Sequence, residues 1–283
     1  MPAPEIGVAL PNYGPAASAQ GVRRTAEAAQ ELGFDSVWLT DHLLVGRDAA
    51  HEYGQVLEPL AALTWLAGRL EGLALGTSIL LLALRNPVQV AKQAAFLQEV
   101  SGGRFWLGVG VGWHRPEYQY LGGHFEERGA RTEEAIRLLR ALWRGEGSFQ
   151  GRWWSFDGAF FGPMPDPPPE VWIGGGSSAA RRRARTLGDA WHPGGPTADE
   201  VAAVRRTWDG RIVPRVAVSF DQDDQHADLA GSPRAVAGGL TRLLQAGADG
   251  MVLSCGNDPD LVIGAMRTAA REILPGLREQ PST

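Results

Sequence analysis

Eight times along the chain, a short apolar run is followed by a longer stretch whose apolar residues recur at helical spacing. Apolar strands that alternate with amphipathic helices are typical of a parallel sheet covered by those helices. Eight such units in about 250 residues are the pattern of a (β/α)8 barrel. The predicted strands span residues 6–12, 36–42, 73–84, 104–112, 171–176, 189–193, 211–220 and 250–255.

The helical stretches follow these strands in order. The predicted helices span residues 19–32, 58–70, 87–100, 127–143, 178–188, 198–208, 233–246 and 259–273. We therefore expect an α/β protein with a single (β/α)8 TIM-barrel domain over residues 1–283. An open doubly wound sheet is the alternative, but it usually carries a phosphate-binding fingerprint after its first strand, and "LPNYGPAAS" is not one.

Two connections are longer than plain barrel loops. Residues 43–57 separate the second strand from its helix, and residues 144–170 separate the fourth helix from the fifth strand. The second insertion is rich in glycine, proline and aromatic residues, and its segment "RWWSF" predicts a short strand or hairpin. Loops of this length in a compact domain are usually functional or disordered.

The composition argues against several classes of protein. Of the 283 residues 44% are hydrophobic and 21% charged, and the net charge is −5, which disfavours nucleic-acid and membrane-surface binding. Cys255 is the only cysteine, so no intrachain disulfide can form, and we expect this residue in the core. No apolar run approaches the ~18 residues of a membrane-spanning helix, and the first residues lack a signal-peptide pattern. A cytoplasmic protein is expected.

An acid and a histidine end the second predicted strand, in the segment "SVWLTDH". In such barrels the active site lies at the carboxyl ends of the strands, so Asp41 and His42 are placed at its rim. One interpretation is a hydrogen-bonded rim pair with a structural role. The other is an acid that binds the polar edge of a ring beside a histidine that moves protons near neutral pH.

Two glycine-rich segments also follow strands. In "WIGGGSSAARRRAR" the free N–H groups at the start of a helix can hold a phosphate, and Arg181, Arg182 and Arg183 either accompany that anion or form a solvated basic face. The segment "GVGVGWH" is a weak dinucleotide fingerprint. Its glycines indicate that a flat group approaches the backbone closely, or that they give room to the neighbouring strand.

Metal and nucleophilic catalysis have little support. The six histidines show no HxH, HxxxH or HExxH spacing, so no metal site is predicted. A GxSxG nucleophile elbow is also missing from the sequence.

Four segments together resemble the bacterial luciferase-like monooxygenase superfamily, and most closely its coenzyme F420-dependent oxidoreductases. They are "ELGFDSVWLTDHLL", "LGTSILLLALRNPVQVAKQAAFLQEVSGGRFWLGVGVGW", "FEERGARTEEAIRLLRALW" and "VWIGGGSSAARRRARTLGDAW". The resemblance covers residues 6 to about 195 and fades after the sixth strand. Each segment alone is modest, but the four in this order are specific.

The resemblance implies roles for individual residues. Asp41 matches an acid expected to hydrogen-bond the deazaflavin ring, and His42 matches a histidine with a catalytic or positioning role. The segment "TSI" matches a bulge with a non-prolyl cis peptide, which we expect between Ser78 and Ile79 against one face of the ring. Val111 is expected near the ring edge. The cofactor's phosphate and tail are assigned to Gly174, Gly175, Gly176 and Ser177.

One position departs from the family pattern. Sugar-phosphate dehydrogenases of the family carry a glutamate as proton donor directly after the glycines of the fourth strand, where this chain has Trp113 followed by His114. This argues against a sugar-phosphate substrate and predicts an aromatic lid, with His114 as a reserve acid. Trp191 is a further candidate for the substrate pocket. Three aromatic residues of the second insertion are expected to extend it: Trp153, Trp154 and Phe156.

The resulting expectation is an F420-dependent oxidoreductase that moves a hydride between the deazaflavin C5 and a small, apolar organic substrate, and that forms a homodimer. The basic residues 181–183 suit the charged F420 tail. The first alternative is an FMN-dependent monooxygenase of the same fold, whose ring site would look almost the same. A non-redox barrel, an isomerase or a hydrolase, is the second alternative, but no base pair or metal set for it can be assembled from the rim.

Overall fold

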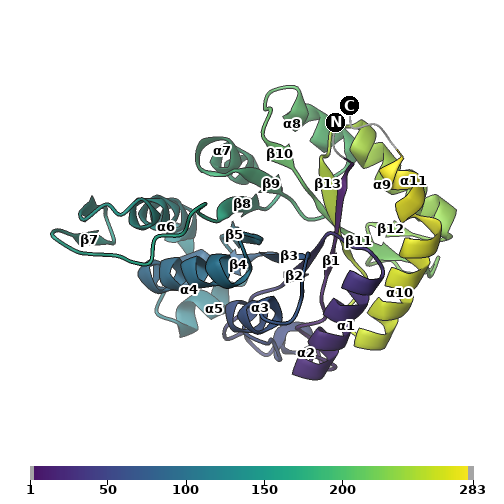
Figure 1. The fold of residues 1–283 in the computed structure, drawn as a ribbon, viewed down its shortest axis with the longest axis horizontal. Helices are drawn as coiled ribbons and strands as arrows, with labels where there is room; N and C mark the ends of the chain where they lie inside the picture. The colour runs from purple at the N-terminus through teal and green to yellow at the C-terminus, as the bar shows by residue number, and fades with distance from the viewer. Residues whose placement is uncertain (1–2, 280–283) are drawn as a thin grey trace.

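The computed structural model describes residues 3–279, and its centre is a ring of parallel strands surrounded by helices (Figure 1). Each neighbouring pair of these strands is parallel. The ring contains β1 (Glu5–Ala9), β2 (Ser36–Leu39), β3 (Ala74–Thr77), β5 (Phe105–Gly110), β8 (Glu170–Gly174), β9 (Ala190–His192), β10 (Arg211–Ile212), β11 (Arg215–Ser219) and β13 (Gly250–Ser254).

Pro214 divides the seventh strand of the ring into two segments. β10 pairs with β9, and β11 pairs with β13, so the interrupted strand joins the two ends of the sheet. The Arg215 N–H donates to the Pro193 carbonyl at 2.8 Å, and the Gly195 N–H donates to the Arg215 carbonyl at 2.9 Å. The predicted eight-stranded barrel is confirmed. Two short strands extend it: β4 (Leu80–Leu81) beside β5 and β12 (Leu229–Ala230) beside β11.

The eight predicted helices are all present. They are α1 (Ala19–Glu31), α3 (Pro59–Ala67), α4 (Pro87–Val100), α6 (Arg128–Trp143), α7 (Ser178–Leu187), α8 (Ala198–Arg205), α9 (Pro233–Gln245) and α10 (Pro259–Glu272). Their starts follow local chemistry: a proline opens α3, α4, α9 and α10, and a side-chain oxygen caps the first backbone N–H groups of most of them.

Smaller elements fill the insertions and the ends. They are α2 (Ala50–Tyr53), α5 (Arg115–Tyr120), α11 (Leu274–Arg278), the 3-10 turns η1 (Leu82–Leu84) and η2 (Phe125–Glu127), and the hairpin of β6 (Phe149–Gln150) and β7 (Ser155–Phe156). The predicted hairpin of the second insertion is therefore present, whereas α5, directly after Trp113, was not predicted. Within residues 3–279, no helix combines the length and the apolar character needed to cross a bilayer.

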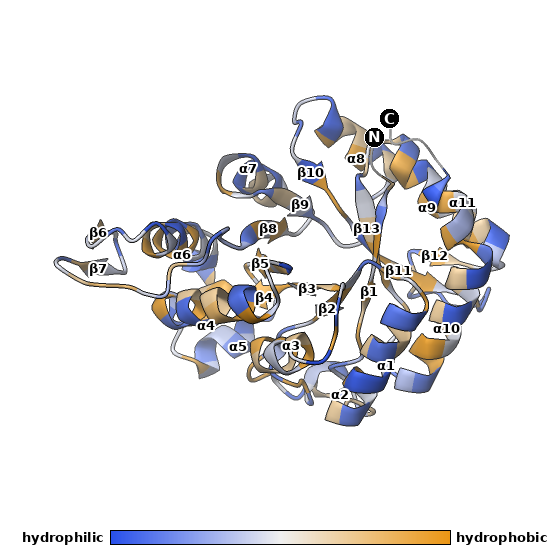
Figure 2. Ribbon diagram, in the orientation of Figure 1, coloured by the Kyte–Doolittle hydropathy of each residue, from blue (hydrophilic) through white to orange (hydrophobic). Residues whose placement is uncertain are grey.

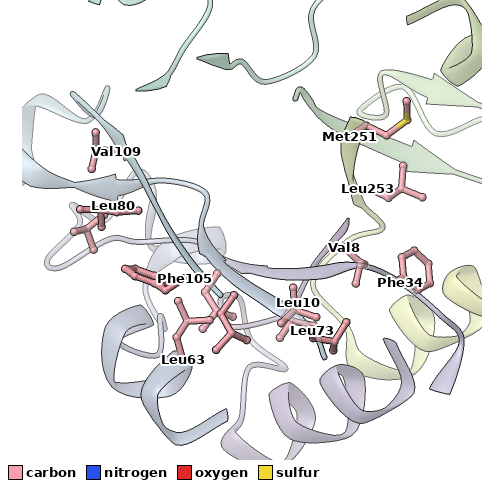
Figure 3. Packing of buried hydrophobic residues seen from close by; sticks show 14 of the residues in the cluster. Val8, Leu10, Phe34, Leu63, Leu73, Leu80, Phe105, Val109, Met251 and Leu253 are labelled. Carbon is pink, nitrogen blue, oxygen red and sulfur yellow. The ribbon is translucent and has the colours of Figure 1, made fainter. Parts of the chain in front are cut away.

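The main core lies between the outer face of the barrel and the helices. In Figure 3, Leu63 of α3 lies beside Phe105 of β5, and Val8 of β1 lies near Phe34; all four are buried. Figure 2 shows strands that are mostly hydrophobic, whereas the surrounding helices carry both hydrophobic and hydrophilic residues. This one-sided pattern is what a helix layer over a parallel sheet requires.

Three tryptophans fill the inside of the barrel. Trp38, Trp106 and Trp172 pack ring against ring, with centroids 4.8 to 5.7 Å apart. Glycines make room for them: a Cβ on Gly76 would lie 2.3 Å from the Trp38 ring, and one on Gly7 would lie 2.7 Å from its indole nitrogen. The indoles therefore close the barrel below its carboxyl end, and a ligand has to bind above them, at the mouth.

Candidate active site

A buried histidine–carboxylate pair stands at the end of β2. The His42 Nδ1 lies 2.8 Å from the Glu117 carboxylate of α5, and the two side chains are only 5% and 1% exposed. The other Glu117 oxygen accepts the N–H groups of Leu43 and Leu44, at 2.6 and 3.2 Å. Glu117 thus holds both the His42 ring and the first residues of the insertion 43–57.

The protonation of this pair follows from its contacts. Burial raises the pKa of Glu117, but the hydrogen bonds from His42 and from the Leu43 and Leu44 amides outweigh it, so the pKa is lowered overall. An ionised carboxylate can only accept hydrogen bonds, so the His42 Nδ1 carries a proton. Nε2 is the other ring nitrogen, and it has no hydrogen-bond partner among residues 3–279.

His42 stands in a group of aromatic rings. We call this group, Tyr13, Tyr53, His42 and Trp113, the aromatic wall. The ring centroids of His42 and Tyr53 are 4.5 Å apart, those of Tyr53 and Tyr13 are 5.3 Å apart, and Trp113 meets the His42 ring edge-on at 5.9 Å. Trp113 is 57% exposed. Burial, followed by the hydrogen bond with Glu52, raises the pKa of Tyr53, so its phenol stays neutral.

His114 is already hydrogen-bonded to a backbone N–H group. It is 2% exposed, and its Nε2 accepts the Gly46 N–H at 2.9 Å. This contact ties the insertion 43–57 to the end of β5. The predicted role of His114 as a reserve acid would require it to release Gly46, whereas His42 needs no such rearrangement.

Asp41 is held inside the protein. Its carboxylate makes two hydrogen bonds with the Arg85 guanidinium, at 2.6 and 3.0 Å, and accepts the Leu81 N–H at 2.9 Å. Arg85 also pairs with Glu58 at 2.9 Å. The resemblance implies that Asp41 hydrogen-bonds the deazaflavin ring. To accept such a hydrogen bond, the carboxylate would have to share or replace one of these contacts.

The bulge after β3 has the predicted conformation, since the peptide bond between Ser78 and Ile79 is cis. The Ser78 hydroxyl lies 2.8 Å from the His192 Nε2, and His192 contacts the Val213 carbonyl through Nδ1. Burial lowers the pKa of His192 to about 4, against the opposing effect of that carbonyl. His192 is therefore a neutral support of the bulge at neutral pH.

The glycines of β5 make room for this bulge. A Cβ on Gly108 would lie 1.9 Å from the Thr77 carbonyl oxygen, and a Cβ on Gly110 would lie 1.7 Å from the end of the Ile79 side chain. The interpretation of "GVGVG" in which the glycines make room for the neighbouring strand agrees with these contacts, and the residues accommodated are Thr77 and Ile79. The predicted Val111 follows directly and accepts a hydrogen bond from the Tyr118 hydroxyl at 2.6 Å.

The loop from Gly174 to Ser177 leads into α7. Ser177 caps the helix by accepting the Ala180 N–H at 3.1 Å, and Gly175 adopts a φ of +102°. A Cβ on Gly176 would meet no atom within 4 Å, so this backbone is open to a ligand. The nearby arginines have other partners: Arg182 and Arg183 pair with Glu133, and Arg181 lies 4.0 Å from Glu200.

Four predicted pocket residues lie away from the aromatic wall. Trp191 is buried in the layer between sheet and helices, where its indole N–H donates to the Gly175 carbonyl at 2.9 Å. The second insertion packs along α6: Glu134 accepts the N–H groups of Trp153 and Trp154. The remaining residue is Phe156, in the hairpin that extends away from the barrel (Figure 1). The second insertion connects a helix to the next strand, so it starts at the face of the barrel opposite the mouth. For this reason its aromatic residues do not lie in the predicted pocket.

Three residues at the mouth were not predicted from the sequence: Glu117, Tyr53 and Arg215. Arg215 begins β11 and donates to Thr40, Ser78 and Ser254 at the mouth. Among residues 3–279, no three His, Cys, Asp or Glu side chains are placed to hold a metal ion together.

Comparisons with known proteins identify the family. The family model of the luciferase-like monooxygenases matches residues 5–228. The F420-dependent glucose-6-phosphate dehydrogenase of Amycolatopsis mediterranei is 35% identical over 171 residues, 59% of this chain and 50% of that protein. This chain spans about half the length of the curated relatives it matches.

Two solved structures share the fold equally well. A monooxygenase from Streptomyces bottropensis, RslO1, superposes with a TM-score of 0.81 at 20% identity, covering 96% of this chain and 99% of that one. An F420-dependent secondary alcohol dehydrogenase in complex with an F420-acetone adduct gives 0.81 at 19% identity, covering 99% and 100%. With most of its barrel matched by the family model, the chain belongs to the luciferase-like monooxygenase family.

Proposed function

We propose that this protein is an F420-dependent oxidoreductase that transfers a hydride between the deazaflavin C5 and a small, largely apolar organic substrate. The observation that carries the proposal is the His42–Glu117 pair, which stands within the aromatic wall at the barrel mouth. Its curated relatives favour F420 as the cofactor, because those matches are named F420-dependent dehydrogenases.

The residues at the mouth fit such a cofactor. The Ser78–Ile79 bulge offers a backbone surface for one face of a ring, and the open loop from Gly174 to Ser177 offers N–H groups at the start of α7 for a phosphate. The deazaflavin, when bound, supplies or accepts the hydride. The protein orients the ring, excludes water and manages one proton.

His42 is the residue assigned to the proton. Hydride transfer to a carbonyl carbon leaves charge on its oxygen, and a proton from the His42 Nε2 neutralises that charge; in the opposite direction Nε2 takes the proton from a hydroxyl. Glu117 keeps Nδ1 protonated and stabilises the ring when it becomes positively charged.

The aromatic wall indicates what kind of substrate can bind beside His42. Trp113 occupies the position at which sugar-phosphate dehydrogenases of the family carry an acid, and its exposed indole gives an apolar surface next to His42. Apolar and aromatic contacts favour a substrate with hydrocarbon character around its reacting carbon.

The rival cofactor is FMN. The fold does not distinguish a monooxygenase from an F420-dependent dehydrogenase, since both superpose on this chain with the same TM-score. The ion pairs of Arg181, Arg182 and Arg183 with glutamates also weaken the earlier argument that these residues await the F420 tail. The preference for F420 rests on the curated relatives. Family membership disfavours a non-redox isomerase or hydrolase.

The test is a fluorescence titration of the purified protein with F420 and, separately, with FMN. We expect F420 to bind at least tenfold more tightly than FMN. A Gly176→Asp variant places a carboxylate in the open loop and should weaken F420 by repelling its phosphate, whereas Gly264→Asp, on α10, should not. Preferential binding of FMN would overturn the cofactor, and binding of neither would overturn the redox function.

Two expectations concern the surroundings of the protein. We propose a homodimer because α4 exposes Val88, Phe96 and Val100, and the second insertion exposes Phe160 and Met164. Native mass spectrometry that shows only monomers would contradict this. A cytoplasmic location is proposed as well, and cell fractionation tests it.

A further inference from the structure

Arg215 brings a positive charge to the barrel mouth and finds only neutral partners there. Its Nη1 donates to the Thr40 hydroxyl at 2.9 Å and to the Ser78 carbonyl at 2.8 Å, and its Nη2 donates to the Ser254 hydroxyl at 3.0 Å. No carboxylate among residues 3–279 forms an ion pair with this half-buried guanidinium. Its charge is therefore not balanced by the part of the chain that the structure describes.

The guanidinium has donors left for a ligand. It carries five N–H groups, and three of them are accounted for by Thr40, Ser78 and Ser254. The other two belong to Nε and Nη2. Arg85 binds the Asp41 carboxylate with this same pair of nitrogens, at 3.0 and 2.6 Å. A planar anion is the ligand that such a fork recognises best.

The neighbouring titratable groups do not supply that anion. They include the Asp41–Arg85 pair, the His42–Glu117 pair, Tyr53, His192 and Asp228. Asp41 and Glu117 are already bonded inside their own pairs, and Asp228 accepts the Ala217 N–H at 2.7 Å and forms no ion pair among the described residues. His192 is neutral at neutral pH, and the Arg215 charge adds to the burial that keeps its pKa low. A partly buried charge without a counterion is costly, and an anionic ligand would offset that cost.

We propose that Arg215 binds an anionic oxygen of a ligand at the barrel mouth. Two sources share this chemistry: a carboxylate on an otherwise apolar substrate, and the N1–C2=O edge of the deazaflavin, which becomes anionic on reduction. The inference builds on the proposed function and refines it, because it adds an anionic group to a ligand that the aromatic wall otherwise predicts to be largely apolar. It does not depend on which of the two cofactors binds.

The experiment compares the wild-type protein with Arg215→Gln, using two pairs of probes. Oxidised and reduced F420 have the same charged tail and differ in the ring, while benzoate and benzamide have nearly the same shape and differ in charge. We expect the variant to weaken reduced F420 or benzoate by about tenfold or more, and the other member of the same pair, oxidised F420 or benzamide, by less than twofold. A selective loss for reduced F420 assigns the fork to the ring, and a selective loss for benzoate assigns it to the substrate.

A structural role for Arg215 would give a different result. Three results would overturn the proposal. The first is equal weakening of both members in each pair of probes, and the second is no change in any probe. The third is no binding of benzoate together with no loss of affinity for reduced F420. Arg215→Lys keeps the charge without the fork, and should retain part of the selectivity if Arg215→Gln folds poorly. If neither the variants nor the wild-type protein bind F420, the proposed function is contradicted. The benzoate–benzamide pair still tests Arg215 in that case.

Discussion

Two arginines of the seventh strand point into the barrel, one near each end. Arg211 lies at the floor, where it pairs with Glu5 at 2.8 Å and with Glu170 at 3.1 Å and packs over the Trp172 ring. Arg215 lies four residues further, on the same side of the strand, and contacts only hydroxyl and carbonyl oxygens. The same residue type thus has two carboxylate partners at one end and none among the described residues at the other.

The difference separates a closed end from an open one. At the floor, Arg211 has two carboxylate partners among the described residues, and the three indoles above it fill the interior. At the mouth, one ring nitrogen of His42 and two N–H groups of Arg215 have no hydrogen-bond partner among the described residues. Substitutions at the floor should therefore change stability, and substitutions at the mouth should change binding and turnover.

The largest expected effect is the loss of the proton carrier at the mouth. His42→Gln removes the Nε2 acid–base function while it preserves a hydrogen bond to Glu117, so turnover should fall by roughly 10²- to 10⁴-fold. The F420 affinity should change by less than threefold, because the proposed cofactor contacts lie at the Ser78–Ile79 bulge and in the loop from Gly174 to Ser177. Single-turnover kinetics and fluorescence titration measure the two quantities. His124→Gln, on the loop beyond α5, is the matched control; unchanged turnover in His42→Gln would remove His42 from the mechanism.

A smaller effect on turnover is expected from Glu117→Gln. The amide no longer holds His42 in a single tautomer or stabilises its positive form, so turnover should fall by roughly ten- to a hundredfold. The distinguishing measurement is the pH profile. The profile should change its shape as well as its height in the variant, because a negative charge next to the proposed proton carrier is lost. A profile that only shrinks in height, with the same midpoint, would indicate a purely structural role for Glu117.

Most of the fold could be predicted because the period of the apolar residues is a local signal. The helix from 87 to 100 is an example, with Asn86 as cap and Pro87 at its first turn, and its bounds agree with the structure. The short helix α5 could not be read this way, since six residues show too little periodicity. Its proline, Pro116, was the one available signal of a helix start.

The site was harder because its contacts are distant in sequence. His42 and Asp41 were identified from their place after a strand, but their partners Glu117 and Arg85 lie 75 and 44 residues away, and no spacing rule connects them. Arg215 was within reach of sequence reasoning. In "RIVPRVAVSF" alternate residues face the same side, so an arginine two steps beyond an inward Val213 had to enter the barrel.

The third prediction tests the floor. Arg211→Gln removes the partner of two carboxylates, and we expect the free energy of unfolding to fall by about 1–2 kcal/mol, with F420 affinity unchanged. Chemical denaturation and the titration measure these effects. Arg206→Gln, on the surface after α8, is the control and should leave stability within about 0.5 kcal/mol. A change in ligand binding with no change in stability would break the division between floor and mouth.

The smallest expected effect concerns pH at the same end. Burial raises the pKa of Glu5 from 4.5 to about 7, and the opposing effects of Arg211 and Ser36 do not reverse it. Between these values the unfolded chain releases the proton that the folded protein keeps, so stability falls as the pH rises through this window.

Glu5→Gln should remove that slope. The variant is expected to gain on the order of 1 kcal/mol relative to the wild-type protein between pH 5 and pH 8, measured by urea denaturation at both values. Glu279→Gln, at the exposed end of the described chain, should leave the slope unchanged. If Glu5→Gln instead loses stability more strongly at pH 8 than at pH 5, the ion pair with Arg211 outweighs burial. The floor would then be held by charge attraction as well as by the packing of its indoles.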